Sequence, residues 1–229
     1  MASLKKYFQL LKQYPELFRN TGETGEIKII KDRKRIREEQ NKIREKLRAK
    51  GNPISWIDIG VISEDAWFWV VRDMVEFPGG NTGGYIRFIN RKSQEGGFNV
   101  ILMCVRNGQV LMIKRFRHEG RNWSWEFPRG FGEPGLTAEE NARKELEEET
   151  GFKNARLTLL ANVSEGQGGT SVYLAEIPSD EKLELESGEG IAEHRWIGFT
   201  ELKQLVLQGQ LNDWFSLWAY SLANVKHIV

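Results

Sequence analysis

Cysteine is almost absent from this chain of 229 residues, which contains one, Cys104. A single cysteine excludes a disulfide within the chain and a zinc cluster built from cysteines. The surrounding apolar run VILMCV (100–105) predicts that Cys104 is a packing residue. With 40% hydrophobic and 11% aromatic residues, the chain can instead be stabilised by a sizeable hydrophobic core.

The sequence also lacks a charge excess and long apolar segments. A formal net charge of +1 provides no overall field that would attract nucleic acid or an anionic membrane. No apolar segment approaches the roughly 18 residues that span a bilayer, and MASLKKYFQLLKQYPELF is unlike a signal peptide. We therefore expect a cytoplasmic protein with no membrane partner, for which nucleic acid is not the main ligand.

Two helical patterns open the chain. Apolar residues spaced for one helix face run from Leu4 to Leu11, and Pro15 stands where this helix should end. The segment 31–50 is rich in lysine and arginine, with a thin apolar stripe and Gly51 as a stop. Because glutamates alternate with its cations at ion-pair spacing, it is predicted to be a salt-bridged surface helix and not a nucleic-acid arm.

Short apolar runs broken by glycines follow from Trp56 onward. The runs at 67–75 and 85–90 predict two strands joined by a long hairpin loop, and Asn107-Gly108 between apolar runs predicts a tight hairpin. Further strands are expected at 156–161, 170–176 and 193–199, and helices at 200–207 and 212–223. Strands mixed with segregated helices indicate an α/β or α+β sandwich, not a doubly wound sheet.

An acidic helix carries the first functional signal. Thr137 and Glu140 form a capping-box pattern at its start, and Gly151 marks its end. Glu145, Glu148 and Glu149 fall within about a third of the helix circumference. Like charges so placed repel by a few tenths of a kcal/mol each. A divalent cation such as Mg²⁺ or Mn²⁺ would relieve the repulsion, although a solvated acidic surface is the alternative.

The loop WEFPRGFGEPG (125–135) leads from a predicted strand into this helix. Its glycines allow the backbone to approach a ligand closely, and a backbone carbonyl there can coordinate a metal ion. Strand, glycine loop and acidic helix therefore form one candidate metal-binding unit.

Residues 130–152, GFGEPGLTAEENARKELEEETGF, resemble the signature of the Nudix hydrolases. Two positions depart from it, because Leu136 stands at the first glutamate and Lys144 replaces the arginine. Lysine keeps the positive charge but lacks the planar fork of arginine. The positions in register are Gly130, Glu145, Leu146, Glu148, Glu149, Gly151 and Phe152, the last in place of an aliphatic residue.

From about Asp58 onward the chain is similar to the ADP-ribose pyrophosphatase branch of this family. The resemblance implies an α/β/α sandwich with a mixed sheet, dependence on Mg²⁺ or Mn²⁺, and hydrolysis of ADP-ribose or a related nucleotide sugar. It also implies a homodimer, since the amino-terminal subdomain of this branch commonly mediates dimers. The expected division is a helical extension at 1–52, a β subdomain at 53–92 and the Nudix domain at 93–229.

The resemblance also assigns site residues. Glu145 and Glu149 match the main metal ligands, Glu148 a third ligand or a base, and the carbonyl of Arg129 a backbone ligand. These four residues are the expected metal site.

Substrate and general-base positions are expected on other segments. Arg117 matches a phosphate-binding arginine of the branch, and Arg115 or Arg87 could assist it. A catalytic glutamate is expected on a later loop, where Glu165 and then Glu189 are the preferred candidates. Ordinary surface charge is the alternative for each of these residues.

Two other functions stay open. The departures at Leu136 and Lys144 also fit a catalytically weak Nudix-fold protein that senses a nucleotide. The basic segment 31–50 would suit an RNA-end hydrolase of the decapping type, although the balanced charge favours a small-molecule substrate.

Overall fold

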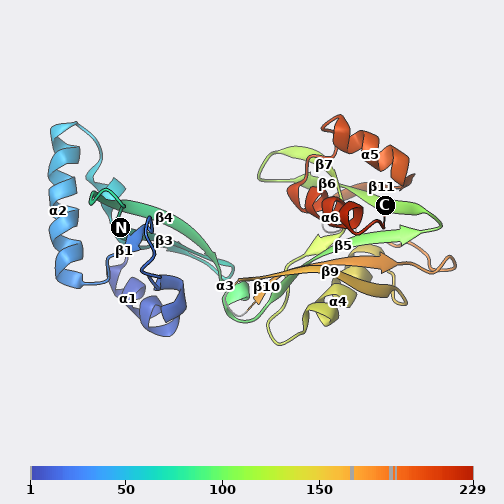
Figure 1. Cartoon of the computed structure of the whole chain (residues 1–229), viewed down its shortest axis with the longest axis horizontal. Coiled ribbons are helices and arrows are strands. Elements are labelled where there is room, and N and C mark those ends of the chain that lie inside the picture. Colours follow the sequence, from blue (N-terminus) through green and yellow to red (C-terminus); the bar gives the residue numbers. More distant parts are fainter. Residues whose placement is uncertain (1, 166–167, 186–187, 189, 229) are drawn as a thin grey trace. The chain divides into compact units, whose positions relative to one another are not determined.

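The computed structural model describes residues 2–165, 168–185, 188 and 190–228. The chain forms two compact units, Met1–Arg91 and Lys92–Val229, and each combines strands with helices (Figure 1). The predicted α+β class is therefore confirmed. Among the described residues, no helix has both the length and the apolar character needed to cross a membrane.

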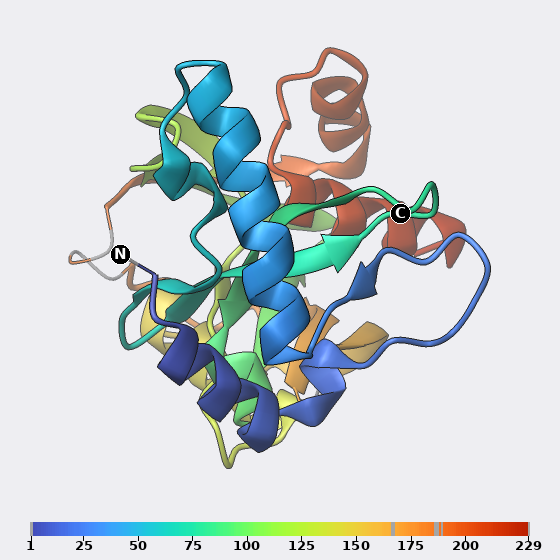
Figure 2. The ribbon, with the colours of Figure 1, turned by 90° about the vertical axis from the view of Figure 1, so that its left-hand side faces the viewer.

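The first unit is built around an antiparallel sheet in which the third strand pairs with each of the other three. Its two main helices cover the sheet, and Figure 2 shows the longer one in front. Its elements are α1 (Leu4–Gln13), the 3₁₀ turn η1 (Pro15–Phe18), β1 (Lys28–Ile29), α2 (Arg33–Ala49), η2 (Ile54–Ile57), β2 (Gly60–Glu64), β3 (Phe68–Glu76) and β4 (Thr82–Asn90).

Both helices of this unit follow their sequence patterns. Helix α1 ends at Gln13 and Pro15 opens the next turn, as predicted. Helix α2 buries Ile36, while its surface carries ion pairs such as Lys42 to Glu39 at 2.7 Å. The predicted salt-bridged surface helix is confirmed.

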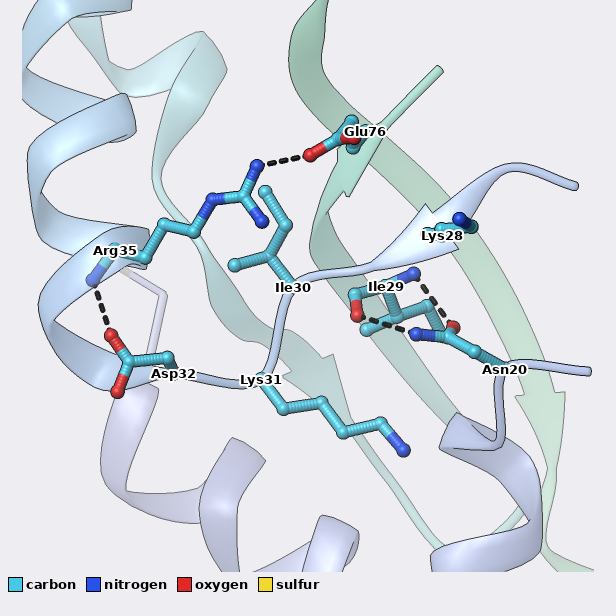
Figure 3. Close-up of a pocket in the computed structure, with 8 residues that line it drawn as sticks. All are labelled: Asn20, Lys28, Ile29, Ile30, Lys31, Asp32, Arg35 and Glu76. Carbon is cyan, nitrogen blue, oxygen red and sulfur yellow. Dashed lines mark hydrogen bonds and ion pairs between the residues drawn. The ribbon is translucent and has the colours of Figure 1, made fainter. Parts of the chain in front are cut away.

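A cavity of about 450 Å³ lies between β1 and the start of α2 (Figure 3). The Arg35 side chain is ion-paired with Glu76, and the Arg35 backbone N–H donates to Asp32 at 2.7 Å. None of the site residues expected from the sequence lines this cavity. The lining residues are Asn20, Lys28, Ile29, Ile30, Lys31, Asp32, Arg35 and Glu76.

The second unit contains one mixed sheet with the strand order β11-β6-β5-β10-β9. Strands β10 and β5 run parallel, whereas the other pairs are antiparallel. Its elements are α3 (Arg91–Gln94), β5 (Phe98–Arg106), β6 (Gln109–Arg117), β7 (Asn122–Glu126), β8 (Arg129–Gly130), α4 (Ala138–Thr150), β9 (Arg156–Glu165), β10 (Gly168–Glu176), β11 (Ile191–Gly198), α5 (Phe199–Leu207) and α6 (Trp214–Val225).

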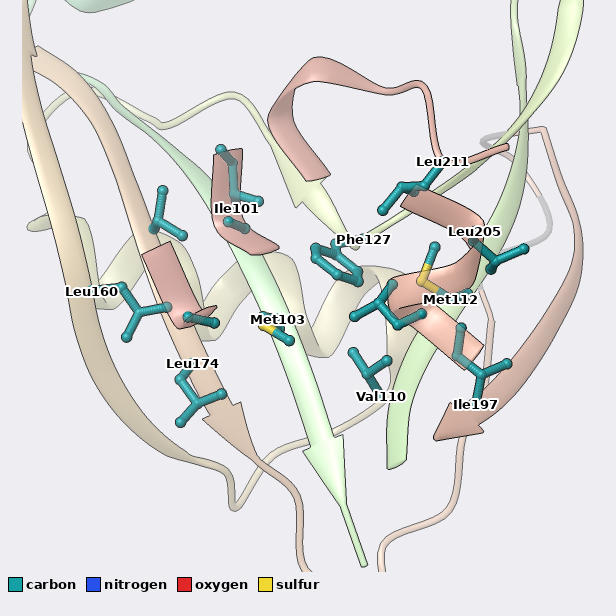
Figure 4. Close-up of a cluster of buried hydrophobic side chains, with 14 residues drawn as sticks. Ile101, Met103, Val110, Met112, Phe127, Leu160, Leu174, Ile197, Leu205 and Leu211 are labelled. Carbon is teal, nitrogen blue, oxygen red and sulfur yellow. The ribbon is translucent and has the colours of Figure 1, made fainter. Parts of the chain in front are cut away.

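Helices cover both faces of this sheet, because successive side chains of a strand point to opposite faces. In β6, Leu111 and Ile113 pack in the core cluster that contains Leu146 of α4. Val110 and Met112 pack in the second cluster, beneath α5 and α6 (Figure 4). The predicted α/β/α sandwich with a mixed sheet is therefore confirmed.

A fork between β5 and β6 makes room for the site. The two strands join at a hairpin where Asn107 and Gly108 have φ of 51° and 74°, confirming the predicted tight turn. They pair only next to this turn, at Val105–Val110 and Arg106–Gln109. Farther along, β7 pairs with β6 and β8 pairs with β5. The fork thus brings β6, β7 and β8 together.

Candidate active site

Helix α4 has the boundaries that its sequence predicts. The Thr137 hydroxyl accepts the Glu140 N–H at 3.2 Å, and the Glu140 carboxylate accepts the Thr137 N–H at 2.7 Å. Gly151 ends the helix in the left-handed conformation with φ of 76°. Because Ala142 and Leu146 are buried against the sheet, the helix cannot rotate and its glutamates have fixed directions.

Two of the expected metal ligands converge on strand β8. The Glu149 carboxylate accepts the N–H of Arg129 at 3.0 Å, and this side chain is only 2% exposed. The Glu145 carboxylate lies so close to Gly130 that a Cβ at that position would overlap it. Since Glu145 and Glu149 are four residues apart, they are neighbours along one side of the helix. A glycine at position 130 is what allows the loop and helix to meet.

The third expected ligand, Glu148, is more exposed than Glu149. Glu148 is 49% exposed, and Lys144 approaches its carboxylate to 3.5 Å. Lys144 also contacts Glu133 of the glycine loop at 2.6 Å. These contacts lower the pKa of Glu133 and raise that of Lys144.

The donors at β8 fit a hard divalent cation. Carboxylate and backbone oxygens are the ligands that Mg²⁺ and Mn²⁺ prefer, and one or two carboxylates commonly suffice for Mg²⁺. Glu145, Glu149 and the Arg129 carbonyl would hold the ion, with Glu148 within one helical turn. In the described part of the chain, no three acidic, histidine or cysteine side chains already surround a common point. Glu149 is instead ion-paired with Arg115.

A buried carboxylate contacts three arginines near Glu149. Glu126 is fully buried and bonded to Arg117, whose Nε lies 2.7 Å from the carboxylate. Arg115 and Arg129 approach Glu126 to 3.6 and 3.8 Å. Burial raises the pKa of Glu126, while the bond from Arg117 opposes the rise. Two arginines of β6 and one of β8 are thus held at the fork.

Residues at the start of α6 hold the side chain of Arg129. Asp213 accepts a hydrogen bond from the Arg129 guanidinium at 3.0 Å, and the ring of Phe215 lies 4.2 Å from the guanidinium carbon. Asp213 also caps α6 by accepting the Ser216 N–H at 2.9 Å. Burial lowers the pKa of Arg129, against the effect of Asp213. Both the backbone and the side chain of Arg129 are therefore fixed.

Three further site residues were expected from the sequence, namely Arg87, Glu165 and Glu189. Arg87 belongs to the first unit, where it binds buried Asp73 at 2.6 Å and the Leu17 carbonyl at 2.8 Å. Glu165 ends β9, but its side chain lies outside the described part of the chain, as does the whole of Glu189. Their substrate and base roles stay predictions.

Three residues in or next to the site were not predicted from the sequence, namely Glu126, Asp213 and Glu133. Asp213 precedes an apolar helical run, so the preference of helix starts for aspartate could have marked it as a cap. Glu126 lies on a strand before the glycine loop, and no local pattern indicates that three arginines meet it. Glu133 lies inside the signature segment at a position that the signature leaves open.

Comparison with known proteins agrees with this geometry. The NUDIX domain model matches residues 95–216, more than half of the chain. RNA pyrophosphohydrolases of Tolumonas auensis and Shewanella sp. (strain MR-7) are 43% and 40% identical over 61 and 62 residues. Each match covers 27% of this chain and 33% of the relative, so the chain spans about a third of the length of these curated relatives.

A solved structure described as an ADP compounds hydrolase is similar to the fold, with a TM-score of 0.60 and 20% identity. The match covers 73% of this chain and 90% of that one. At this identity the likeness shows the fold alone. Since the domain model spans more than half of the sequence and the glycine loop meets the acidic helix as its signature requires, the chain belongs to the Nudix hydrolase family.

Proposed function

We propose that this protein hydrolyses a nucleoside diphosphate linked to another moiety, with ADP-ribose or a related nucleotide sugar as the substrate. The products are a nucleoside monophosphate and a sugar phosphate, and the reaction requires Mg²⁺ or Mn²⁺. The convergence of Glu145 and Glu149 on β8, next to arginines of β6, carries this proposal. The fold shared with a protein described as an ADP compounds hydrolase supports the choice of substrate.

Charge balance explains why a cation is required. Arg115, Arg117 and Arg129 are matched by Glu126, Glu149 and Asp213, so the cluster has no net charge with which to attract a diphosphate. A divalent ion supplies that charge, neutralises the phosphate oxygens and acidifies a bound water.

The protein's own residues bind and orient the substrate. Arg117 is 32% exposed, so its guanidinium can reach a phosphate oxygen while Glu126 holds its position. Arg115 lies beside it on the same face of β6 and can contact a second oxygen. Glu148 is exposed enough to bind the ion or to accept a proton from the attacking water. Arg129 and Gly130 define the edge of the site.

A substrate panel tests the function. Purified protein is incubated with ADP-ribose, other nucleoside diphosphate sugars and dinucleoside polyphosphates, with Mg²⁺, Mn²⁺ or a chelator, and the products are identified. We expect metal-dependent release of AMP and ribose phosphate from ADP-ribose. Metal-dependent cleavage of another member of the panel instead would change the assigned substrate but support the proposed reaction. Nucleotide binding without turnover of any member would identify a sensor instead.

Removal of pyrophosphate from an RNA 5′ end is the second candidate. It is favoured by the curated relatives, which are described as RNA pyrophosphohydrolases. If the basic surface of α2 binds RNA, the affinity for RNA should fall steeply as the salt concentration is raised. The reason is that lysine and arginine side chains release counterions from the RNA phosphates when they bind. Hydrolysis of a triphosphorylated RNA oligonucleotide together with inactivity on ADP-ribose would select this function.

A homodimer is also proposed, because an edge strand of the first unit carries exposed apolar side chains. Within the described residues, strand β4 pairs only with β3, and it exposes Tyr85, Ile86 and Phe88, the last to 75%. An edge strand with exposed apolar side chains can pair with a second copy. Light scattering should give twice the 26.5 kDa mass of the chain.

Phe88→Asp is expected to shift this mass to that of one chain, because a carboxylate would be buried in the interface. Trp214→Ser is a control, since this aromatic residue is also highly exposed and belongs to the second unit. A wild-type monomer, or a dimer that persists in Phe88→Asp, would contradict this interface.

A further inference from the structure

The glycine loop is attached to α4 by a residue at a position that the family signature leaves open. Glu133 contacts Lys144 at 2.6 Å, although the two are 11 positions apart in the sequence. Its backbone is held as well, because its N–H donates to the Asn141 side chain at 2.8 Å and its carbonyl accepts from the same side chain at 3.3 Å. Asn141 is buried, so this attachment is rigid.

Lys144 connects this loop residue to a proposed metal ligand. Its ammonium group lies 2.6 Å from Glu133 and 3.5 Å from Glu148, which is one helical turn farther along. The shorter contact is therefore with Glu133, which is not a proposed metal ligand. The Lys144 ammonium is a compact charge on a flexible side chain, so it moves toward the nearer carboxylate. Its attraction to Glu133 therefore limits how closely it approaches Glu148.

Each of the two departures from the signature contacts Glu133, Leu136 through its backbone and Lys144 through its side chain. Leu136 has no carboxylate to offer Lys144, and its N–H is turned back to the Glu133 carbonyl at 3.5 Å. Glu133, three residues earlier, supplies a carboxylate instead.

We propose that Glu133 is a positioning residue that holds Lys144 away from the metal ligands and leaves Glu148 available to the ion. This inference rests on the proposed metal-dependent function. Without the Glu133 carboxylate, Lys144 has Glu148 as its remaining near partner. The ammonium would then occupy Glu148 and place an unbalanced positive charge beside the cation site. Metal affinity therefore falls even though no ligand has been changed.

Glu133→Gln in the full-length protein tests this. Mn²⁺ binding is measured without substrate, from the electron paramagnetic resonance signal of free Mn²⁺. We expect roughly tenfold weaker binding, at the lower end of the 10- to 100-fold loss typical of outer partners of metal ligands. Glu139→Gln is the matched control, because it breaks an exposed ion pair with Arg143 on the same helix at 2.7 Å. Its Mn²⁺ affinity should equal that of wild type.

A double-mutant cycle separates positioning from a merely structural role. In a Lys144→Met background, Glu133→Gln should change Mn²⁺ affinity by less than about twofold, because the charge it controlled is gone. Unchanged Mn²⁺ binding in the single Glu133→Gln protein overturns the inference alone. An equal loss in both backgrounds also overturns it, since Glu133 would then act without Lys144. Failure of the wild type to bind Mn²⁺ overturns both the inference and the proposed function.

Discussion

Replacing Glu149 with glutamine is expected to lower kcat for the best substrate by about 10³-fold, because metal stabilisation is worth several kcal/mol and each 1.36 kcal/mol is tenfold. The glutamine amide keeps an oxygen for the Arg129 N–H, which Glu149 accepts at 3.0 Å, but it loses the charge that pairs with Arg115, so the folding of the variant is checked directly. The amide has no negative charge, however, and cannot serve as a ligand of comparable strength for a divalent ion.

Turnover of Glu149→Gln is measured at saturating metal and substrate, with melting curves to verify folding. Glu147→Gln is the control, since Glu147 is exposed on the same helix and contacts Lys153 at 3.0 Å instead of the site. This control should retain wild-type turnover. If Glu149→Gln stays folded and loses less than about tenfold in kcat, Glu149 does not hold the catalytic ion.

The largest effect on stability is expected for Glu126→Ala. Removing one member of a buried ion pair costs about 3–5 kcal/mol, because the partner charge stays buried without compensation. Glu126 is the carboxylate shared by Arg117, Arg115 and Arg129, of which Arg115 has a 7% exposed side chain. Its loss leaves three neighbouring positive charges that repel one another inside the fork between β5 and β6.

Urea unfolding followed by tryptophan fluorescence measures this loss. Glu126→Gln should fall between wild type and Glu126→Ala, because its amide oxygen still accepts one hydrogen bond from Arg117. Glu139→Ala, on the exposed surface of α4, should leave the unfolding midpoint unchanged. A free energy of unfolding within about 1 kcal/mol of wild type for Glu126→Ala would show that water reaches the cluster and compensates the arginines.

Predictions that depended on neighbouring residues were confirmed. Asn107-Gly108 forms the tight turn, Thr137 and Glu140 form the capping box, and Gly151 ends α4 in the left-handed conformation. In each case the relevant interactions span only a few residues along the chain. The spacing of the signature likewise predicted the family, because it encodes one loop and one helix that are contiguous.

Contacts between distant segments could not be predicted in this way. Arg115 meets Glu149, Arg129 meets Asp213 and Arg87 meets Asp73 because strands and helices pack at particular registers. Arg87 illustrates the limit most directly. Sequence patterns do not indicate that a buried aspartate of the neighbouring strand and the Leu17 carbonyl contact its guanidinium, and its role in substrate binding stays a prediction.

The amino-acid sequence by itself determined the helices, the main hairpin, the α+β class and the acidic face of α4, since these follow from local hydrogen bonding and hydrophobic periodicity. Only the tertiary structure decided that Glu145 and Glu149 reach β8 and that Lys144 lies closer to Glu133 than to Glu148. The physical reason is that the fork between β5 and β6 sets which side chains meet, and strand pairing is a property of the whole sheet.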